Sequence, residues 1–557
     1  MTENPGPESL STPTEPIDPG VPASAATSAR ESEPERRRRL ARSTAFFSVA
    51  TGASRIAGLV REIAAASRFG VTGPMSAFTI AYQVPNVLRA LFAEGPLQAG
   101  FVPVFTELLE NGKKKEAFRV ASSLFFLIVL VLGGLTAVFV LLAPVVMPLL
   151  APGFDDQPEL RHLTIVLSQI LFVTVPLLAV SGLVVGMLYA FDRFAGPALA
   201  PLAWNVVVIG FLVGVVPMLS AGDRIYGYAA GVLVGTVVML LLPVPWLRGL
   251  GGRFTVALDW RDPNVRRVLK LMLPVTLALG LVSLNLVIDS FFGTLVSPQT
   301  PAAIERAFRV YQLPQGLFSV AIATVLFPTL ARYAVRGERD NLRATMAGGV
   351  RQTALLLIPS AFVLAVLSEP ITRLVYQRGA FGGHATHLVS TAMVWWAVAL
   401  PFEGVSLLYT RTFFSLQRTW ITTPLALANI GLNAIVALAL HGPFGISGIV
   451  IGTVVGTASM TALQAAILRR DLGSIEGRAT ALAFGRMLLA GLALGAASYA
   501  VWRGLDAALG RALWAQIVSL GMAIAAGGAV YAAAVLAMRV REAHEIWGLV
   551  KGRVRRA

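Results

Sequence analysis

Apolar stretches of about 20 residues recur along this chain from residue 42 to residue 539, and short polar loops separate them. A helix of that length crosses the hydrocarbon core of a bilayer, and it satisfies its backbone hydrogen bonds internally, as lipid requires. Composition agrees, because 55% of the residues are hydrophobic and only 14% are charged, whereas a soluble domain has about 25% charged residues. The pattern predicts an all-α integral membrane protein.

The same pattern predicts fourteen transmembrane helices. They are expected at residues 42–68, 75–94, 117–149, 160–190, 197–219, 225–246, 265–296, 303–331, 344–376, 386–415, 420–440, 446–468, 479–504 and 513–539. The predicted division is a disordered cytoplasmic N-terminal tail (1–41), an N-lobe (42–248), a basic cytoplasmic linker (249–264), a C-lobe (265–470), two further helices (479–539) and a basic cytoplasmic tail (540–557). The first 40 residues are rich in Pro, Ser, Thr and Glu and contain no apolar run, which is the basis for predicting disorder there.

The distribution of charge orients the predicted bundle. The formal net charge is +16, and Lys and Arg crowd loops such as ENGKKKEAFR and RYAVRGERDNLR rather than SPQTPAAIE and HGPFG. Cytoplasmic loops of membrane proteins carry this excess, so nucleic acid is not needed to explain it and is not expected as a partner. The cluster Arg36–Arg39 precedes the first span. Both termini are therefore predicted to be cytoplasmic, since an even number of spans returns the chain to the same side.

The residues that enzymes and metal sites use are scarce. Cysteine is absent, which excludes disulfides, thiolate nucleophiles and Cys-ligated metals. Two of the five histidines, His384 and His387, lie in the Gly-rich stretch GAFGGHATH, which is expected to be a solvated loop rather than a metal site. No set of paired acids or histidines marks a membrane enzyme. A protein that is not an enzyme is expected.

Two segments of the chain resemble each other. YQVPNVLRALFAEGPLQAGFVPVF begins at Tyr82 in the second span, and YQLPQGLFSVAIATVLFPTL begins at Tyr311 in the eighth. Six spans separate them, and an even number keeps both copies in the same orientation. The chain is therefore predicted to form two parallel six-helix lobes around a central cavity, plus two C-terminal helices. Transporters are commonly built from such repeats, with the substrate held between them.

Several charged residues fall inside predicted spans, where a charge costs at least about 2.5–3.5 kcal/mol. They are Arg55, Arg61, Glu62, Arg89, Glu94 and Arg309. Arg55 and Glu62 are seven residues apart and share a helix face, whereas Arg61 points about a third of a turn away. Arginine binds phosphate with a planar fork that stays charged, so the four arginines favour a cavity for a multiply charged anion. The structural alternative is that Arg61 and Arg89 neutralise Glu62 and Glu94 while Arg55 extends to the membrane interface.

A second group of polar residues lies in the predicted C-lobe. Asp289 is an intramembrane acid, Asn429 and Asn433 share one face of a later span, and Thr453 lies in the next. Their oxygens suit a small hard cation such as Na⁺. The alternative is that the Asn and Thr side chains hydrogen-bond between helices.

Several motifs of the chain resemble those of the lipid II flippases of peptidoglycan synthesis, the MurJ/MviN family. These are SRIAGLVREIAAASRFGVTGPMSAFTIAYQVPNVLRALFAEGPLQAGFVPVF, APGFDD, ERAFRVYQLPQGLFSVAIATVLFPTLARYA and LVYQRGAFGGHAT. The resemblance covers residues 42–540. It implies the fold of the multidrug/oligosaccharidyl-lipid/polysaccharide exporters, with fourteen helices, in a bacterial cell membrane.

The resemblance also implies roles for residues. Arg55, Arg61, Arg89 and Arg309 would line a cationic cavity for the lipid-linked diphosphate, together with Glu62 and Glu94. Two positions depart from the family pattern, because Ser76 stands where many members have Asp and Pro96 replaces a small residue. The lobes would rock around Pro85 and Pro314 in an alternating-access cycle.

The implied substrate is lipid II, an undecaprenyl-diphosphate-linked disaccharide-pentapeptide, and cell-wall synthesis proteins are a further class of partner. No cofactor is implied, and the membrane potential or a cation gradient such as Na⁺ would supply energy. Two alternatives stay open, which are a flippase for another polyprenyl-diphosphate-linked glycan and a cation-coupled multidrug antiporter of the same fold. The antiporter is less favoured because cationic drugs suit acids and aromatic rings, not arginines.

Overall fold

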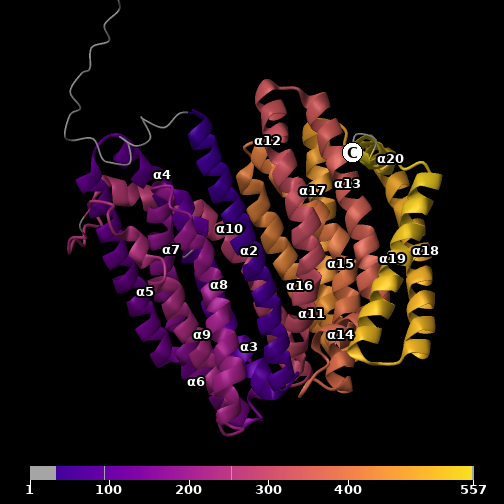
Figure 1. The fold of residues 1–557 in the computed structure, drawn as a ribbon, viewed down its shortest axis with the longest axis horizontal. Coiled ribbons are helices and arrows are strands. Elements are labelled where there is room, and N and C mark those ends of the chain that lie inside the picture. The colour runs from indigo at the N-terminus through magenta and orange to yellow at the C-terminus, as the bar shows by residue number, and fades with distance from the viewer. Residues whose placement is uncertain (1–32, 93–94, 253, 555–557) are drawn as a thin grey trace, which may run out of the picture.

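The computed structural model describes residues 33–92, 95–252 and 254–554, and those residues form a bundle of helices without any strand (Figure 1). The first half contains α2 (Glu33–Phe69), α3 (Gly73–Phe92), α4 (Gly95–Glu110), α5 (Lys114–Leu150), η1 (Pro152–Phe154), α6 (Pro158–Phe172), α7 (Thr174–Ala190), α8 (Ala195–Gly210), η2 (Phe211–Val215), η3 (Val216–Met218), α9 (Arg224–Leu241) and η4 (Val244–Leu247). The second half contains α10 (Pro263–Val296), α11 (Thr300–Pro314), η5 (Gln315–Ser319), α12 (Val320–Arg336), α13 (Arg339–Val366), α14 (Ser368–Tyr376), α15 (Gly383–Ser415), η6 (Thr419–Ile421), α16 (Thr422–Phe444), α17 (Ile446–Leu472), α18 (Gly477–Leu509), α19 (Leu513–Ala537) and α20 (Arg541–Val554).

Eleven helical segments of the described chain are long and apolar enough to cross a membrane. The all-α membrane fold predicted from sequence is therefore confirmed. The other three predicted spans, 42–68, 75–94 and 265–296, coincide with α2, α3 and α10, so the number fourteen stays a prediction. The α2 segment is interrupted by Arg55, Arg61, Glu62 and Arg68.

The predicted N-terminal tail ends earlier than expected. Helix α2 begins at Glu33, so residues 33–41 are helical and the prediction of disorder was wrong for them. Arg, Leu and Ala dominate residues 36–41, and all three have high helix propensity, which lets the first span extend beyond its apolar part. Residues 1–32 lie outside the described chain.

The helices form two groups with α10 between them. In Figure 1, α2–α9 occupy one side, α11–α17 occupy the other, and α18 and α19 form the far edge. Helix α10 packs against α3 and α4 of the first group and against α16 and α17 of the second. We call the two ends of the bundle the α20 end, where α2 begins, and the α14 end, where α2 finishes (Figure 1).

The two groups are joined at the α14 end. The backbone N–H of Ala380 donates to the carbonyl of Ser67 at 2.8 Å. Gly70 and Gly379 both have positive φ, and each lies close to the backbone of the other segment. A Cβ on either residue would lie about 2.5 Å from a carbonyl oxygen. A side chain at either position would separate the loop after α14 from the end of α2.

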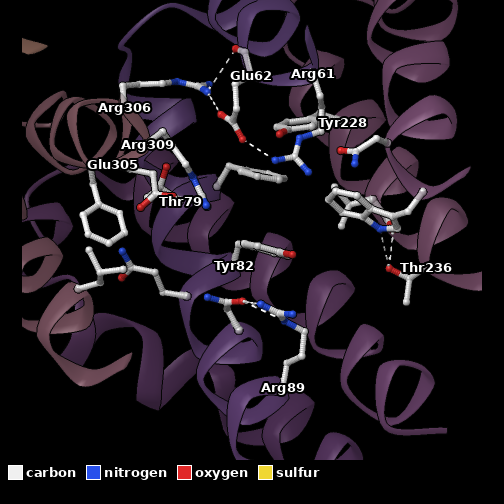
Figure 2. Close-up of a pocket in the computed structure, with 18 of the residues that line it drawn as sticks. Arg61, Glu62, Thr79, Tyr82, Arg89, Tyr228, Thr236, Glu305, Arg306 and Arg309 are labelled. Atoms are coloured by element: carbon white, nitrogen blue, oxygen red, sulfur yellow. Dashed lines mark hydrogen bonds and ion pairs between the residues drawn. The ribbon is translucent and has the colours of Figure 1, made fainter. Parts of the chain in front are cut away.

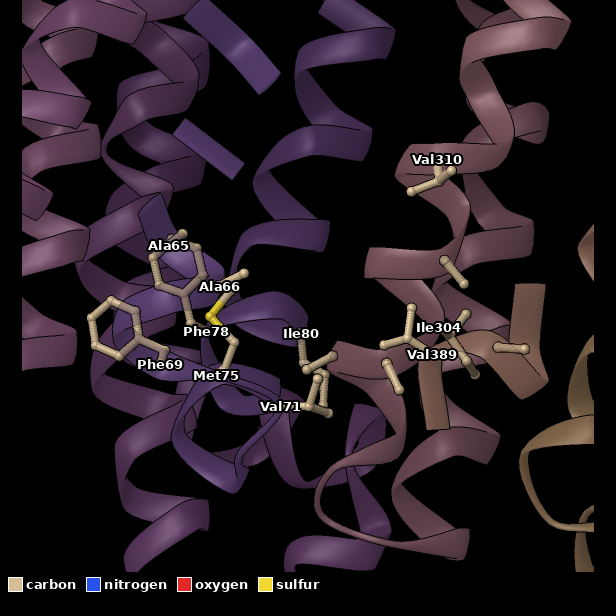
Figure 3. Close-up of a cluster of buried hydrophobic side chains, with 14 of the residues drawn as sticks. Ala65, Ala66, Phe69, Val71, Met75, Phe78, Ile80, Ile304, Val310 and Val389 are labelled. Carbon is tan, nitrogen blue, oxygen red and sulfur yellow. The ribbon is translucent and has the colours of Figure 1, made fainter. Parts of the chain in front are cut away.

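Apolar packing continues across the same junction. One buried cluster contains side chains from α2 and α3 on one side and from α11 and α15 on the other (Figure 3). Its members include Ala65, Ala66, Phe69, Met75, Phe78, Ile80, Ile304, Val310 and Val389. Ser76 is fully buried there, and its Oγ accepts a hydrogen bond from the backbone N–H of Ala302 at 3.1 Å. Ser76, where the resemblance led us to expect Asp, therefore joins α3 to α11.

The two resembling segments differ in detail. In the first, α3 runs through Pro85 without a break, and α4 begins at Gly95. In the second, α11 ends at Pro314 and continues through the π-helical turn η5 into α12. Proline removes a helical hydrogen bond, and π turns mark local irregularity in helices. The irregular backbone therefore follows the proline directly only in the second copy.

Candidate functional site

A cavity of about 530 Å³ lies between the two groups of helices. Helices α2, α3, α8, α9 and α11 supply most of its lining. Six charged side chains line it, and they are Arg61, Glu62, Arg89, Glu305, Arg306 and Arg309. Figure 2 shows that they come from both groups and point toward a common space.

Helix α2 packs on α8 through the face that contains Gly58. This packing places Arg61 and Glu62 at the cavity. Gly58 lies against Asn205, and Arg61 extends over the ring of Trp204, with 4.6 Å between the guanidinium carbon and the ring centroid. A cation over a Trp face is attracted by the ring quadrupole. Trp204 is itself held by a hydrogen bond from its Nε1 to Thr236 at 3.3 Å. The Arg61 side chain is therefore oriented by the N-terminal group of helices.

Glu62 joins the two groups electrostatically. It accepts a hydrogen bond from Arg61 at 2.5 Å and forms a second ion pair with Arg306 of α11. Arg306 is only 2% exposed. A buried charge needs a partner because removing one side of such a pair leaves an uncompensated ion. Glu62 thus holds one cation from each side at the α14 end of the cavity.

Arg309 lies one helical turn from Arg306 on α11. Its guanidinium pairs with Glu305 at 2.6 Å. The Nε atoms of Arg61 and Arg309 are buried and have no hydrogen-bond partner within the described part of the chain. Buried donors are nearly always paired in folded proteins, so in this conformation Arg61 and Arg309 each keep one donor without a partner within the described chain.

Arg89 occupies a different level of the cavity. Its Nε and Nη2 donate to Asn86 Oδ1 at 3.1 and 2.8 Å, and Tyr82 lies between it and the Glu62 cluster (Figure 2). Counting the described lining residues, four arginines face two glutamates. The cavity therefore carries a formal excess of two positive charges and is suited to an anion.

The structure brings together only some of the predicted residues. Arg61, Glu62, Arg89 and Arg309 all line the cavity. Arg55 is exposed and is not among the lining residues, so the expectation that it lines the cavity was wrong. Seven residues along a helix give the same face but a position about 10 Å away along the axis, and the cavity does not extend that far along α2. Glu94 lies outside the described residues.

Sequence reasoning missed two lining residues, Glu305 and Arg306. Both belong to ERAFR, the segment that also contains Arg309. The three-residue spacing from Arg306 to Arg309 was the available signal, since residues three apart lie on neighbouring positions of a helix surface. No local pattern indicated that Glu62 would be the partner of Arg306, because the two residues are 244 positions apart in the chain.

The predicted cation residues form a second polar cluster, between α10, α16 and α17. Asp289 is fully buried and accepts hydrogen bonds from Asn433 Nδ2 and Thr453 Oγ1, each at 3.1 Å. Asn433 Oδ1 has no hydrogen-bond partner among the residues described. Asn429 does not join the cluster, because its amide donates to the sulfur of Met460 at 3.4 Å.

The structure brings together no group of three His, Asp or Glu side chains that could hold a metal ion, within the ranges described. His384 and His387 are both exposed near the start of α15. The Asp289 cluster therefore differs from a transition-metal site, because a single carboxylate is accompanied by amide and hydroxyl groups.

Comparisons with known proteins agree with this geometry. The sequence profile of a family described as lipid II flippase MurJ matches residues 65–510. A probable lipid II flippase MurJ from Rhizobium meliloti (strain 1021) is 33% identical over 73% of this chain and 76% of its own length. The lipid II flippase MurJ of Burkholderia cenocepacia is 28% identical over 69% of this chain and 75% of its own.

Solved structures share the fold. A lipid II flippase MurJ in an inward closed conformation superimposes with a TM-score of 0.72 at 23% identity, covering 88% of this chain and 98% of that one. An inward-facing multidrug resistance transporter of the MATE family, from the MOP superfamily, gives a TM-score of 0.61 at 16% identity over 76% of this chain and 96% of its own. These likenesses show a common architecture.

Proposed function

This chain belongs to the lipid II flippase MurJ family, and we propose on that premise that it moves lipid II from the cytoplasmic to the outer leaflet by alternating access. The family is one of transporters, so no covalent chemistry is required of the site. The cavity would hold the charged head group while the polyprenyl tail stays in the lipid.

The observation that carries this proposal is the cluster of Arg61, Arg306 and Arg309 around Glu62. A diphosphate has adjacent phosphate groups with several acceptor oxygens, and arginine forks bind such groups with two hydrogen bonds each. Arg61 of α2 and Arg309 of α11 line the cavity from the two groups of helices, and the Nε of each has no partner within the described chain. Glu62 keeps Arg61 and Arg306 in place before substrate arrives, so little side-chain ordering is left for binding.

The contacts at the α14 end suggest how the cycle runs. We place the α20 end in the cytoplasm, because the basic loops gather there. The Ser67–Ala380 and Ser76–Ala302 hydrogen bonds would then close the cavity on the outer side. Release of the head group outside requires these contacts and the Glu62–Arg306 pair to separate. The π turn after Pro314 is a segment of α11–α12 that is able to bend during this step.

We further propose that the Asp289 cluster takes a coupling cation. A small hard cation prefers oxygen ligands, and the Asp289 carboxylate, Thr453 hydroxyl and Asn433 Oδ1 fit that preference. Asp289 is buried without a cationic side chain among its described hydrogen-bond and ion-pair partners. A bound Na⁺ would supply that missing charge. Asn429 is left out of this set.

The test uses cells depleted of their own lipid II flippase. The parent chain and an Arg309→Ala variant are expressed at equal membrane abundance, and lipid II accessible at the outer leaflet is quantified. We expect the parent to restore exposure and Arg309→Ala to lose most of it, because the variant removes one of the arginines that line the cavity. Arg332→Ala, which changes an exposed arginine of α12 outside the cavity, is the matched control and should behave as the parent.

Two results would contradict the proposal in different ways. If the well-inserted parent restores no exposure, the substrate is another polyprenyl-linked glycan or a different anion. If Arg309→Ala restores exposure as fully as the parent, the arginines serve packing and not substrate binding.

A further inference from the structure

The linker between η4 and α10 lies along the first turns of α5. Residues 254–259 form no regular secondary structure. The backbone N–H of Thr255 donates to Ser122 Oγ at 3.2 Å, and Asp259 pairs with Arg119 at 3.1 Å. The Phe254 ring contacts the ring of Phe125, with centroids 6.2 Å apart. The linker is therefore fixed to the helix at both of its ends and is not a free loop.

The linker carries an exposed apolar side chain at every second position from Phe254 to Trp260. Thr255 binds α5 through its backbone N–H and Asp259 through its carboxylate, whereas Val256 is 91% exposed, Leu258 52% and Trp260 55%. Phe254 also keeps 47% of its surface exposed. We call Phe254, Val256, Leu258 and Trp260 the linker ridge. A contiguous exposed apolar strip of this kind marks an interaction surface.

The linker ridge lies at the level of a membrane interface. Helix α5 has 37 residues, which corresponds to about 55 Å, whereas the hydrocarbon core is about 30 Å thick. The linker contacts residues 118–125, and the outward-facing apolar surface of α5 begins one turn later at Val129 and Leu130. Helix α5 lies at the outer edge of the bundle, away from the other group of helices (Figure 1). The ridge is thus continuous with the lipid-facing band of α5.

Cations accompany the ridge. Arg261 and Arg266 both approach the Trp260 ring, at 5.1 and 5.7 Å from its centroid. Lys115 and Lys270 are exposed nearby in the chain, at the starts of α5 and α10. Trp is enriched at membrane interfaces, and the cytoplasmic leaflet attracts basic segments through its anionic lipids. The combination of apolar side chains with flanking cations therefore matches an anionic lipid surface.

We propose that the linker ridge inserts into the interfacial layer of the cytoplasmic leaflet and that Arg261 and Arg266 bind the phosphates of anionic phospholipids there. The leaflet rests on the orientation given under the proposed function. Because the linker connects the two groups of helices, this anchor holds the junction at a fixed depth while the groups move.

The test exploits the absence of cysteine from the chain. Val256→Cys is labelled with a nitroxide, and the full-length protein is placed in nanodiscs of phosphatidylcholine with or without phosphatidylglycerol. Collision of the label with oxygen, which partitions into lipid, is compared with collision with a water-soluble nickel chelate. Val138→Cys on α5 and Arg339→Cys at the start of α13 give the lipid and water references, since both residues are exposed at those places.

With phosphatidylglycerol, we expect the Val256 label to prefer oxygen, as the Val138 label does. The double variant Arg261→Gln/Arg266→Gln should lose this preference. If the Val256 label is as accessible to nickel as the Arg339 label, the proposal is overturned. The ridge would then face water and be open to a protein partner instead of lipid. The Val256 label could instead prefer oxygen equally with and without phosphatidylglycerol, and keep this preference in the double variant. That result would overturn the assignment to anionic lipid. None of these readouts depends on lipid II. The proposed anchor and the proposed transport function can therefore be contradicted separately.

Discussion

Two carboxylates buried in the bundle are stabilised in opposite ways. Glu62 lies between two arginines, one from α2 and one from α11. Asp289 is fully buried, and its hydrogen-bond partners in the described structure are the neutral groups of Asn433 and Thr453. A buried carboxylate that is paired with arginines joins the helices that carry them. A buried carboxylate that is hydrogen-bonded only to neutral groups keeps a negative charge that a bound cation can neutralise. We infer that Glu62 organises the closed cavity and that Asp289 serves coupling.

The largest effect should come from breaking the Glu62 pair. In Arg306→Met the buried Glu62 loses its only partner from α11, and breaking a buried pair costs about 3–5 kcal/mol. We expect a clear fall in the melting temperature of the purified protein in detergent.

The double variant Glu62→Gln/Arg306→Met is the control, because it removes both charges and should recover part of the loss. An Arg306→Met protein that melts at the parental temperature would show that Glu62 does not join the two groups.

A smaller effect is expected at the other carboxylate. If Asp289 binds Na⁺, replacing choline by Na⁺ at constant ionic strength should stabilise the parent, by about 2.7 kcal/mol when Na⁺ is at 100 times its dissociation constant. Asp289→Asn keeps the shape and should abolish this Na⁺-dependent rise in melting temperature, while Glu62→Gln should keep it. The same rise in Asp289→Asn as in the parent would rule out the carboxylate as a cation ligand.

The neighbouring asparagines sharpen the comparison further. Asn433 touches Asp289, whereas Asn429, one turn away, contacts Met460. Asn433→Ala should lower the Na⁺ affinity about tenfold, as the loss of roughly 1.4 kcal/mol implies, and Asn429→Ala should leave it near the parental value. Isothermal titration with Na⁺ measures both. Equal losses in the two variants would place Asn429 in the site after all.

The smallest effect is expected at Arg55. Its side chain is exposed and outside the cavity, and substitutions at such positions change stability by about 0.5 kcal/mol or less. Arg55→Ala should therefore restore lipid II exposure in depleted cells as the parent does. Loss of exposure at equal abundance would mean that the cavity reaches farther along α2 in another step of the cycle.

The sequence was sufficient to predict the helices but not all of their partners. Apolar periodicity is local, so spans such as 446–468 lie within the observed helices. The grouping of Asp289, Asn433 and Thr453 was also predicted. Polar side chains in apolar helices have few hydrogen-bond partners other than one another. Depth along a helix was not predicted, which explains the error at Arg55.

The role of Arg306 could not be read from the sequence for a different reason. Its partner Glu62 is on another helix 244 residues away, and only the tertiary fold, in which α11 packs against α3, brings the two side chains together. Glu305 was missed although it is adjacent, and its pairing with Arg309 lowers the positive excess of the cavity. Predictions of net charge in a cavity therefore need the acids as well as the arginines.

The most direct measurement is the affinity of the purified protein for undecaprenyl diphosphate compared with undecaprenyl monophosphate, by native mass spectrometry, for the parent and for Arg61→Ala/Arg309→Ala. If the arginine cluster recognises the diphosphate, the parent prefers the diphosphate and the double variant binds both lipids equally weakly. If the double variant keeps the parental preference, the diphosphate is bound elsewhere and the central claim is contradicted.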